Sequence, residues 1–373
     1  MCIEEIKIVN SLDKFFELTT PIRTIDAIAT YDYRVEYIHE GYEKTREAEG
    51  VKFHSDSLLS DDPIEKFVAY KVLTENPCKF DADNSLGTCN LMGEIYRKLW
   101  GATVDYSNFM TINGFSDEGG KSVLFGGDVY NSLQTTTGLS KYECVRLYVR
   151  EPMKLKQMLS DMQEVMKVSH VLGNFGLVPA YFNAYRGTSK TIKDYLDRSL
   201  LELKQKGFSY LDVLIDKNRS SEKKRDIEAF VRKKKSQYRD FEASDYIKYI
   251  NLMFLWDMHT DENQIRVISS NIQVWNEIVP TLIKKRSIFM AMMLYFAYKR
   301  SDVYKKMLKK ISDAKNILNY ESVFTLLSEV EGLTEADLDI LREIKGKIFK
   351  SEINTNKEEK SIGTFWQRIF GRR

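Results

Sequence analysis

The most informative part of the sequence is the motif segment, residues 169–187, which reads Ser169-His170-Val171-Leu172-Gly173-Asn174-Phe175-Gly176-Leu177-Val178-Pro179-Ala180-Tyr181-Phe182-Asn183-Ala184-Tyr185-Arg186-Gly187. It contains three glycines, a proline, four aromatic rings and several polar side chains, and it joins two predicted helices. An ordinary connection has about 4–6 residues and is polar. We therefore expect this long, apolar segment to pack against the body of the protein and to form the centre of the fold.

The polar side chains of the motif segment allow two interpretations. In the first, they bond only within the protein: the asparagines bond loop backbone, the histidine caps the preceding helix, and Arg186 pairs with Asp194 or Asp197. In the second, they converge on a pocket for an anionic small ligand, which the guanidinium would face. The candidate ligand-binding residues are then His170, Asn174, Asn183 and Arg186.

The motif segment resembles a bacterial family whose members carry a His-x-Ile-Gly-Asn-Phe motif, followed by Pro and by Asn-x-x-Arg-Gly. The resemblance covers roughly residues 165–205, and Leu172 replaces the usual Ile. This family is an uncharacterised domain of unknown function, so the resemblance implies a bacterial, intracellular origin and no chemistry. Our leading interpretation is a binding or regulatory module, and the general habits of such families imply a link to phage defence or mobile elements.

Outward from the motif segment, apolar periodicity predicts helices on both sides. One stripe runs from Pro152 and ends near Gly173, and a second helix runs from Ser189 to Lys206. Ser122–Phe125, in a glycine-rich stretch, is a candidate strand. The class is mainly α, a multi-helix bundle with a small α+β N-terminal part. Further helices are predicted at 63–73, 91–99, 222–238, 243–257, 279–299, 302–317, 320–329 and 334–349.

Charge divides the chain of 373 residues unevenly, although its formal net charge is only +2. Residues 1–150 carry 16 basic and 24 acidic side chains, and residues 151–373 carry 40 and 30. We predict an acidic N-terminal part of mixed helix and loop at 1–150, a basic helical domain at 151–350, and a linker with a basic tail at 351–373. The two parts either neutralise each other across an interface, or the basic part keeps a face for an anionic partner.

Several classes are excluded by simple features. A hydrophobic fraction of 43% rules out a mostly disordered chain. The longest apolar run, Ser287–Tyr298, would form a helix about 18 Å long, too short for a hydrocarbon core of about 30 Å, so we expect a buried core helix rather than a transmembrane one. The N-terminus has no pattern of a secretory signal, and we therefore place the protein in the cytoplasm. No nucleotide-binding loop or other cofactor motif is present, and no feature indicates an oligomeric state.

An enzymatic alternative rests on Arg34 and His39. Their Arg-x4-His spacing is found in helical endoribonucleases of bacterial defence, which need no metal. Histidine would act as the general acid and base, and arginine would stabilise the phosphate. The spacing is loose, and Val35 stands where those enzymes usually have a polar residue. The alternative interpretation is an ordinary exposed surface.

A metal site is a further candidate after Trp256, where Asp257, His259 and Asp261 lie close together in the sequence. Carboxylates and imidazole are suitable ligands for a divalent ion. Such a cluster is also typical of a helix end that enters a solvated loop, and we expect no bound metal.

Two basic segments indicate anionic partners. Residues 217–239 contain ten basic and three acidic side chains, and a helix at 222–239 would present its basic residues to nucleic acid or to an acidic protein surface. Residues 364–373 form an aromatic and basic tail that would dock on a partner or a membrane surface. The basic surface is formed by Lys223, Lys224, Arg225, Lys233, Lys234 and Lys235.

Overall fold

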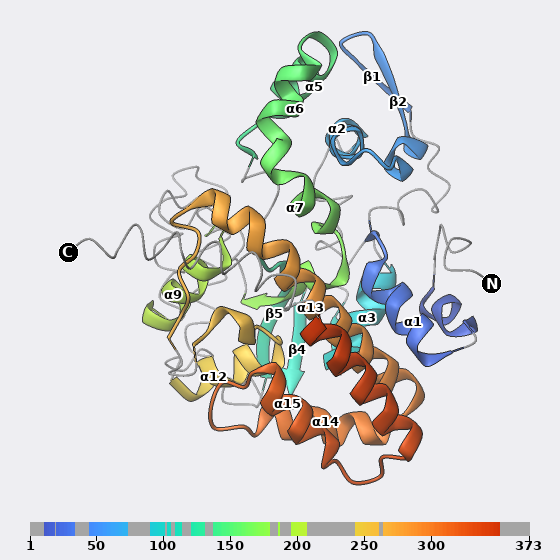
Figure 1. The fold of residues 1–373 in the computed structure, drawn as a ribbon, viewed down its shortest axis with the longest axis vertical. Helices are drawn as coiled ribbons and strands as arrows, with labels where there is room; N and C mark the ends of the chain where they lie inside the picture. The colour runs from blue at the N-terminus through green and yellow to red at the C-terminus, as the bar shows by residue number, and fades with distance from the viewer. Residues whose placement is uncertain are drawn as a thin grey trace.

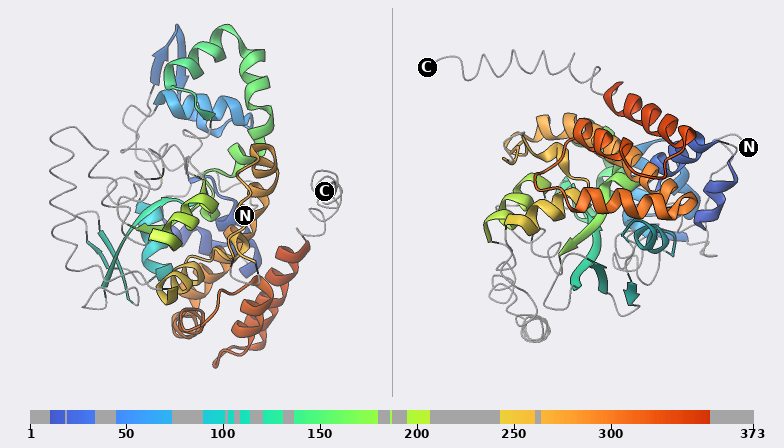
Figure 2. Two further views of the ribbon diagram at one scale, coloured as in Figure 1. Left: turned by 90° about the vertical axis from the view of Figure 1, so that its left-hand side faces the viewer. Right: turned by 90° about the horizontal axis from the view of Figure 1, so that it is seen from below.

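The protein folds into a large main body and a small lobe that projects from it (Figures 1 and 2). Helix α7 (Gln163–Val168) leads from the small lobe into the main body. The architecture is a multi-helix bundle with a small α+β N-terminal part, as predicted. The computed structural model describes residues 11–18, 20–33, 45–73, 90–100, 103–105, 109–113, 121–130, 137–179, 186, 195–206, 243–260 and 264–350.

The long helix α13 (Ile272–Lys299) runs through the middle of the main body (Figure 1). It begins seven residues before the predicted start at 279, because the Asn271 side chain accepts hydrogen bonds from the N–H groups of Gln273 and Val274 at 3.0 and 3.4 Å. Around it lie α1 (Pro21–Thr30), α3 (Asn90–Trp100), α9 (Leu196–Lys206), α12 (Ala243–Leu252), α14 (Ser301–Ser312), α15 (Tyr320–Ser328) and the helical residues 335–350.

An antiparallel sheet in the main body has the strand order β3-β4-β5-β6. Its strands are β3 (Thr103–Asp105), β4 (Phe109–Asn113), β5 (Lys121–Asp128) and β6 (Phe175–Pro179). The predicted strand at Ser122–Phe125 is thus the middle of a longer one. β6 belongs to the motif segment, for which the sequence predicted only a connection. It is a strand because it pairs with β5 and buries Phe175 and Leu177 completely.

The part of the small lobe that the structure describes is built on a hairpin and the helices α2, α5 and α6. Strands β1 (Thr45–Ala48) and β2 (Val51–His54) are joined at Glu49-Gly50, and both residues have positive φ, as a type I′ hairpin turn requires. Helix α2 (Pro63–Leu73) has the predicted bounds, and Asp62 accepts a hydrogen bond from Ile64 N–H at 2.8 Å. α5 (Lys141–Arg150) and α6 (Pro152–Leu159) follow later in the chain. The continuous helix predicted from Pro152 is broken, because the 3₁₀ turn η6 (Ser160–Met162) separates α6 from α7.

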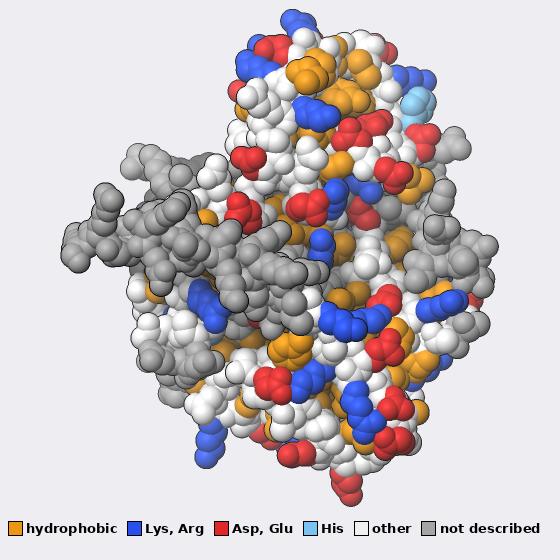
Figure 3. All heavy atoms as spheres, viewed as in Figure 1, with side chains coloured by type: hydrophobic (Ala, Val, Ile, Leu, Met, Phe, Trp, Pro, Cys, Tyr) orange, Lys and Arg blue, Asp and Glu red, His pale blue; other side chains and the backbone are white. Residues whose placement is uncertain are grey.

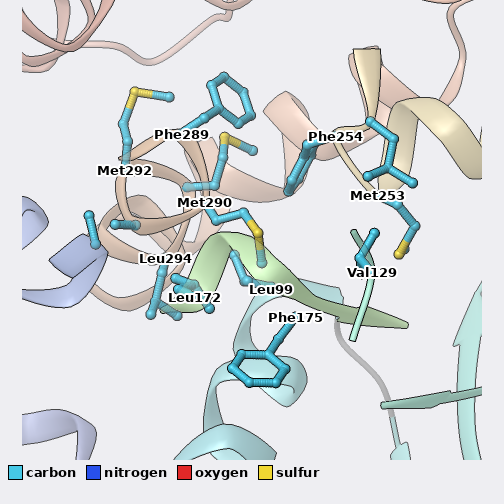
Figure 4. Close-up of a cluster of buried hydrophobic side chains, with 14 of the residues drawn as sticks. Leu99, Val129, Leu172, Phe175, Met253, Phe254, Phe289, Met290, Met292 and Leu294 are labelled. Carbon is cyan, nitrogen blue, oxygen red and sulfur yellow. The ribbon is translucent and has the colours of Figure 1, made fainter. Parts of the chain in front are cut away.

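Two hydrophobic cores hold the molecule together. The main core combines Leu99 and Ile28 with Phe175 and with the fully buried run from Phe289 to Leu294 of α13 (Figure 4). The core of the small lobe combines side chains of α2, α5, α6 and α7. Both cores draw residues from both sides of position 150, so packing does not follow the boundary between the acidic and basic parts. Apolar contact and the ion pair of Lys347 with Asp26 (2.5 Å) join the two parts.

The surface differs between the lobe and the body. Hydrophobic side chains gather at the tip of the small lobe, whereas acidic and basic side chains are interspersed over the rest of this face (Figure 3). Tyr142 of α5 and Met153 of α6 are 64% and 75% exposed. Among the described residues, no helix combines the length and hydropathy that crossing a bilayer requires.

Candidate functional site

The motif segment contains the 3₁₀ turn η7 (Leu172–Asn174) directly before β6. The asparagine of this turn extends the sheet beyond its last regular pair. Asn174 Nδ2 donates to the Ser169 carbonyl at 2.7 Å, and its Oδ1 accepts from Tyr130 N–H at 3.1 Å. Its own carbonyl accepts from Val129 N–H at 2.6 Å. All these groups are buried, so Asn174 satisfies backbone atoms that would otherwise lack partners.

Close packing requires two glycines of the motif segment, Gly173 in η7 and Gly176 in β6. A Cβ at Gly173 would overlap the Ile283 carbonyl oxygen of α13 and lie 2.7 Å from Ser287 N. A Cβ at Gly176 would lie 2.8 Å from both Arg286 Nη2 and Val129 Cγ2. The main chain of the motif segment therefore lies directly against α13, which only glycine allows at these positions.

Arg286 of α13 binds the free edge of β6, which has no strand on its outer side in the described sheet. Its Nη1 donates to the Gly173 and Phe175 carbonyls at 2.5 and 2.7 Å, and its Nε donates to the Met253 carbonyl at 2.9 Å. Tyr249 OH donates to the next outward carbonyl, that of Leu177, at 3.1 Å. Side chains thus cover an edge that would otherwise expose unpaired backbone groups.

The charge of Arg286 is unusual for its position. The side chain is fully buried and forms no ion pair with a described carboxylate. Burial lowers the pKa of the guanidinium, and the nearby tyrosine hydroxyls of Tyr130, Tyr320, Tyr96 and Tyr249 oppose this shift. Three carbonyl dipoles therefore carry the main stabilisation of this cation, in place of a counter-ion.

The predicted ligand residues are brought together only in part. Arg186 is 1% exposed and donates from Nη1 to the Val129 carbonyl at 2.8 Å, beside the partners of Asn174. Of the two predicted partners of Arg186, Asp197 is bonded elsewhere: its carboxylate accepts from the N–H groups of Ile268 and Ser269, both at 2.7 Å. Asn183 and Asp194 lie outside the described residues.

His170 joins the two cores. Its ring contacts Tyr70 of the small lobe and Phe175 of the main core edge to face, with centroids 4.9 and 5.9 Å apart. Nδ1 is hydrogen-bonded to Ser169 Oγ at 2.9 Å, and the His170 carbonyl accepts from Tyr33 N–H at 3.0 Å. The contacts of this histidine therefore support the junction of lobe and body.

The other predicted functional residues, apart from Asp257 and His259, lie in parts of the chain that the structure does not describe. Arg34 and His39, the basic residues of 222–239, the tail 364–373 and Asp261 all lie outside the described residues. Tyr33, the residue directly before Arg34 in the chain, is bonded to the motif segment. The nuclease, the basic surface and the tail therefore stay predictions.

The described members of the metal candidate have other contacts. His259 is buried, with Nε2 at 2.8 Å from Tyr246 OH and Nδ1 at 3.3 Å from the Leu255 carbonyl, so both ring nitrogens have partners within the protein. No group of three potential ligands is found among the residues that the structure describes. Burial, followed by the charges of Lys204 and Arg266, lowers the pKa of His259 to about 4.

We expect His259 to make the protein sensitive to acid. The neutral ring is retained in the folded state down to about pH 4, whereas an unfolded histidine takes up a proton near pH 6.5. The contribution of His259 to the free energy of unfolding is therefore fully present above about pH 6.5. It is lost as the pH falls from 6.5 to 4, and the loss amounts to about 3 kcal/mol. Urea unfolding at a series of pH values measures the loss. His259→Gln should flatten the curve over this range, and an unchanged curve would contradict the assignment.

A second cluster, which we call the aromatic–lysine surface, is formed where three distant segments meet. The 3₁₀ helix η2 (Leu12–Glu17) lies on α3, with Leu12 N–H donating to Glu94 Oε2 at 3.2 Å. The Tyr298 hydroxyl, near the end of α13, donates to Asp13. The surface consists of Lys14, Phe16, Arg97, Lys98, Tyr298 and Lys299.

The rings of Phe16 and Tyr298 form the centre of this surface. They stack with centroids 3.8 Å apart and planes inclined by 9°, and both are partly exposed. Lys98 Nζ lies 5.4 Å from the Tyr298 centroid, and Lys299 Nζ lies 5.3 and 5.2 Å from the two centroids. Such distances are typical of cation–π contact. The stack thus holds two ammonium groups beside flat aromatic faces.

In the aromatic–lysine surface the cations have no described ion-pair partner, whereas two of the neighbouring carboxylates accept hydrogen bonds. Lys14, Arg97, Lys98 and Lys299 are exposed and form no ion pair with a described residue. Of the three neighbouring carboxylates, Asp13 and Glu94 accept the hydrogen bonds from Tyr298 and Leu12, and Glu17 is exposed. The bond to Asp13 raises the pKa of the Tyr298 hydroxyl, which stays neutral. The cations are therefore available to an anionic partner.

Sequence reasoning missed this surface because its members are local only in space. Phe16 and Tyr298 are separated by most of the chain, and neither lies in a recognisable pattern. Lys299 directly follows the apolar run Ser287–Tyr298, where a basic residue is an ordinary flank of a core helix. Arg286 was missed in the same way, because it directly precedes this run.

Comparisons of the chain with protein-family models, with curated proteins and with solved structures found no match. The resemblance of the motif segment to a bacterial family therefore remains a prediction. The geometry of the motif segment supports the first interpretation of its described residues, in which they bond within the protein. The aromatic–lysine surface combines exposed cations that form no ion pair with a described residue and a pair of stacked, partly exposed aromatic rings.

Proposed function

We propose that this protein is a binding or regulatory module that contacts a polyanionic partner through the aromatic–lysine surface. One observation carries the proposal: three separate segments bring exposed cations to an aromatic stack, and two of them, Lys98 and Lys299, lie close to its rings and form no ion pair with a described residue. Cations grouped on one face attract a polyanion, and the attraction weakens as salt screens it. The predicted basic segment at 222–239 would strengthen the same attraction.

The wider setting is an expectation from the sequence. The resemblance of the motif segment implies a bacterial protein, and phage defence or a mobile-element role follows only from the habits of such families. An endoribonuclease using Arg34 and His39, and a pocket for an anionic small ligand at the motif segment, stay alternatives. The described contacts of His170, Asn174 and Arg186 favour a structural role over the pocket.

Charge reversal tests the proposed function. The double variant Lys98→Glu/Lys299→Glu is expected to bind heparin roughly tenfold more weakly at about 100 mM salt, since each lost cation–anion contact weakens binding severalfold. Elution from a heparin column and a salt titration with labelled heparin measure the change. The full-length chain is used, so that the basic segment at 222–239 contributes equally to every variant.

The matched control is Lys154→Glu/Lys156→Glu, which makes the same change of charge on the exposed face of α6. α6 belongs to the small lobe, whereas the aromatic–lysine surface belongs to the main body (Figure 1). We expect the control to bind heparin nearly as tightly as the wild type. Equal losses in the two double variants would mean that only net charge matters, and the proposal would then be wrong.

A further inference from the structure

We infer that the aromatic–lysine surface binds single-stranded nucleic acid, by stacking a base on the Phe16–Tyr298 pair. The inference rests on the proposed function and names the class of its partner. The two rings already lie parallel at 3.8 Å, the arrangement that a stacked base would continue. Tyr295, whose centroid lies 6.1 Å from that of Phe16, adds a third ring on the same side of α13.

Lys98 and Lys299 lie where they could bind the phosphates of a nucleotide stacked on the rings. Lys299 Nζ is almost equally distant from both rings, so it lies beside the stack, where a backbone phosphate of a stacked nucleotide would pass. Lys98 lies over Tyr298. A base that stacks on Tyr298 takes this place and releases the ammonium to the adjacent phosphate. Arg97, one residue away on the exposed side of α3, offers a further contact.

The chemistry favours single strands over other polyanions. Bases in a duplex are already stacked and hide their faces, whereas bases in a single strand stack on aromatic side chains. The carboxylates of an acidic protein surface would pair with the cations, but they would not stack on the two parallel rings. With four cations against three carboxylates, charge alone would hold a partner weakly. Stacking should therefore contribute a large share of the affinity.

The test uses the full chain and a fluorescein-labelled 12-nucleotide oligo(U), with binding followed by fluorescence anisotropy at two salt concentrations. Tyr298→Leu keeps an apolar side chain but removes the ring. It is expected to weaken oligo(U) binding about tenfold, because stacking of one base contributes about a factor of ten. Tyr298→Phe keeps the ring and loses only the hydroxyl bond to Asp13. We expect it to bind within about twofold of the wild type.

Heparin, which has no bases, separates the two proposals. If Tyr298→Leu loses oligo(U) binding but keeps heparin binding, the inference is supported. If Tyr298→Leu binds oligo(U) as the wild type does, or if a 12-base-pair duplex binds more tightly than oligo(U), the inference is overturned while the heparin result can still uphold the proposed function. Equal losses for oligo(U) and heparin would show that the ring only positions the lysines, which also overturns the inference. Circular dichroism verifies that both variants are folded.

Discussion

Gly173→Ala is expected to destabilise the protein by about 3 kcal/mol or more, because the added methyl group has no place to go. The Cβ would overlap the Ile283 carbonyl oxygen and approach Ser287 N and Cβ at 2.7 and 2.9 Å. These atoms belong to the middle of α13, and the next residues of the same helix, Phe289 to Leu294, are fully buried. The backbone of a buried helix cannot give way as a flexible side chain can. Either η7 must leave α13, or the core must open.

The matched control is Gly346→Ala in the helical residues 335–350, where a new Cβ would meet no atom within 4 Å. Alanine favours helix over glycine, so this variant should equal or exceed the wild type in stability by up to about 1 kcal/mol. Urea unfolding followed by circular dichroism compares the two variants. A Gly173→Ala protein with the midpoint of the wild type would show that η7 does not lie against α13 as described.

Helix positions were the part of the fold that the sequence could predict. α2 has the predicted bounds because its apolar spacing and its Asp62 cap are both local signals. α13 is longer than the predicted range 279–299, because the helix passes through Pro280 and begins at the cap formed by the Asn271 side chain. β6 was missed for another reason. Its pairing partner β5 lies about fifty residues earlier, and nothing within Phe175–Pro179 alternates in polarity.

The candidate residues show the same limit. Composition identified the motif segment as important, and the structure places its described part between α13, β5 and the two cores. The role of each residue depended on distant partners, however: Asn174 on Tyr130, His170 on Tyr70, and Arg186 on Val129. The Phe16–Tyr298 stack had no local signal at all. Residue types alone could suggest an anion pocket at the motif segment, but only the coordinates show that Arg186 and the neighbouring Arg286 donate to backbone carbonyls.

Arg286→Met is the second variant with a large expected effect, a loss of about 3–5 kcal/mol. Methionine fills similar space but leaves the carbonyls of Gly173, Phe175 and Met253 without their donor. Each buried, unpaired carbonyl costs about 1–3 kcal/mol. Removing a buried charge returns part of this cost, since burial already lowers the pKa of Arg286. Arg286→Lys should be intermediate, because one ammonium cannot reach all three carbonyls as the planar guanidinium does.

The measurement should separate the edge of β6 from the rest of the molecule. Hydrogen exchange is expected to accelerate first in β5, β6 and η7, with the small lobe unaffected, because its core is separate. Arg342→Met is the matched control: this exposed arginine pairs with Glu335 and Asp339, both at 2.7 Å, and such surface pairs contribute little. If Arg286→Met were as stable as Arg342→Met, charge burial would outweigh the three carbonyl bonds. The Arg286 guanidinium would then not be the group that holds β6 against α13, and this buried arginine would have a role other than stabilising the fold.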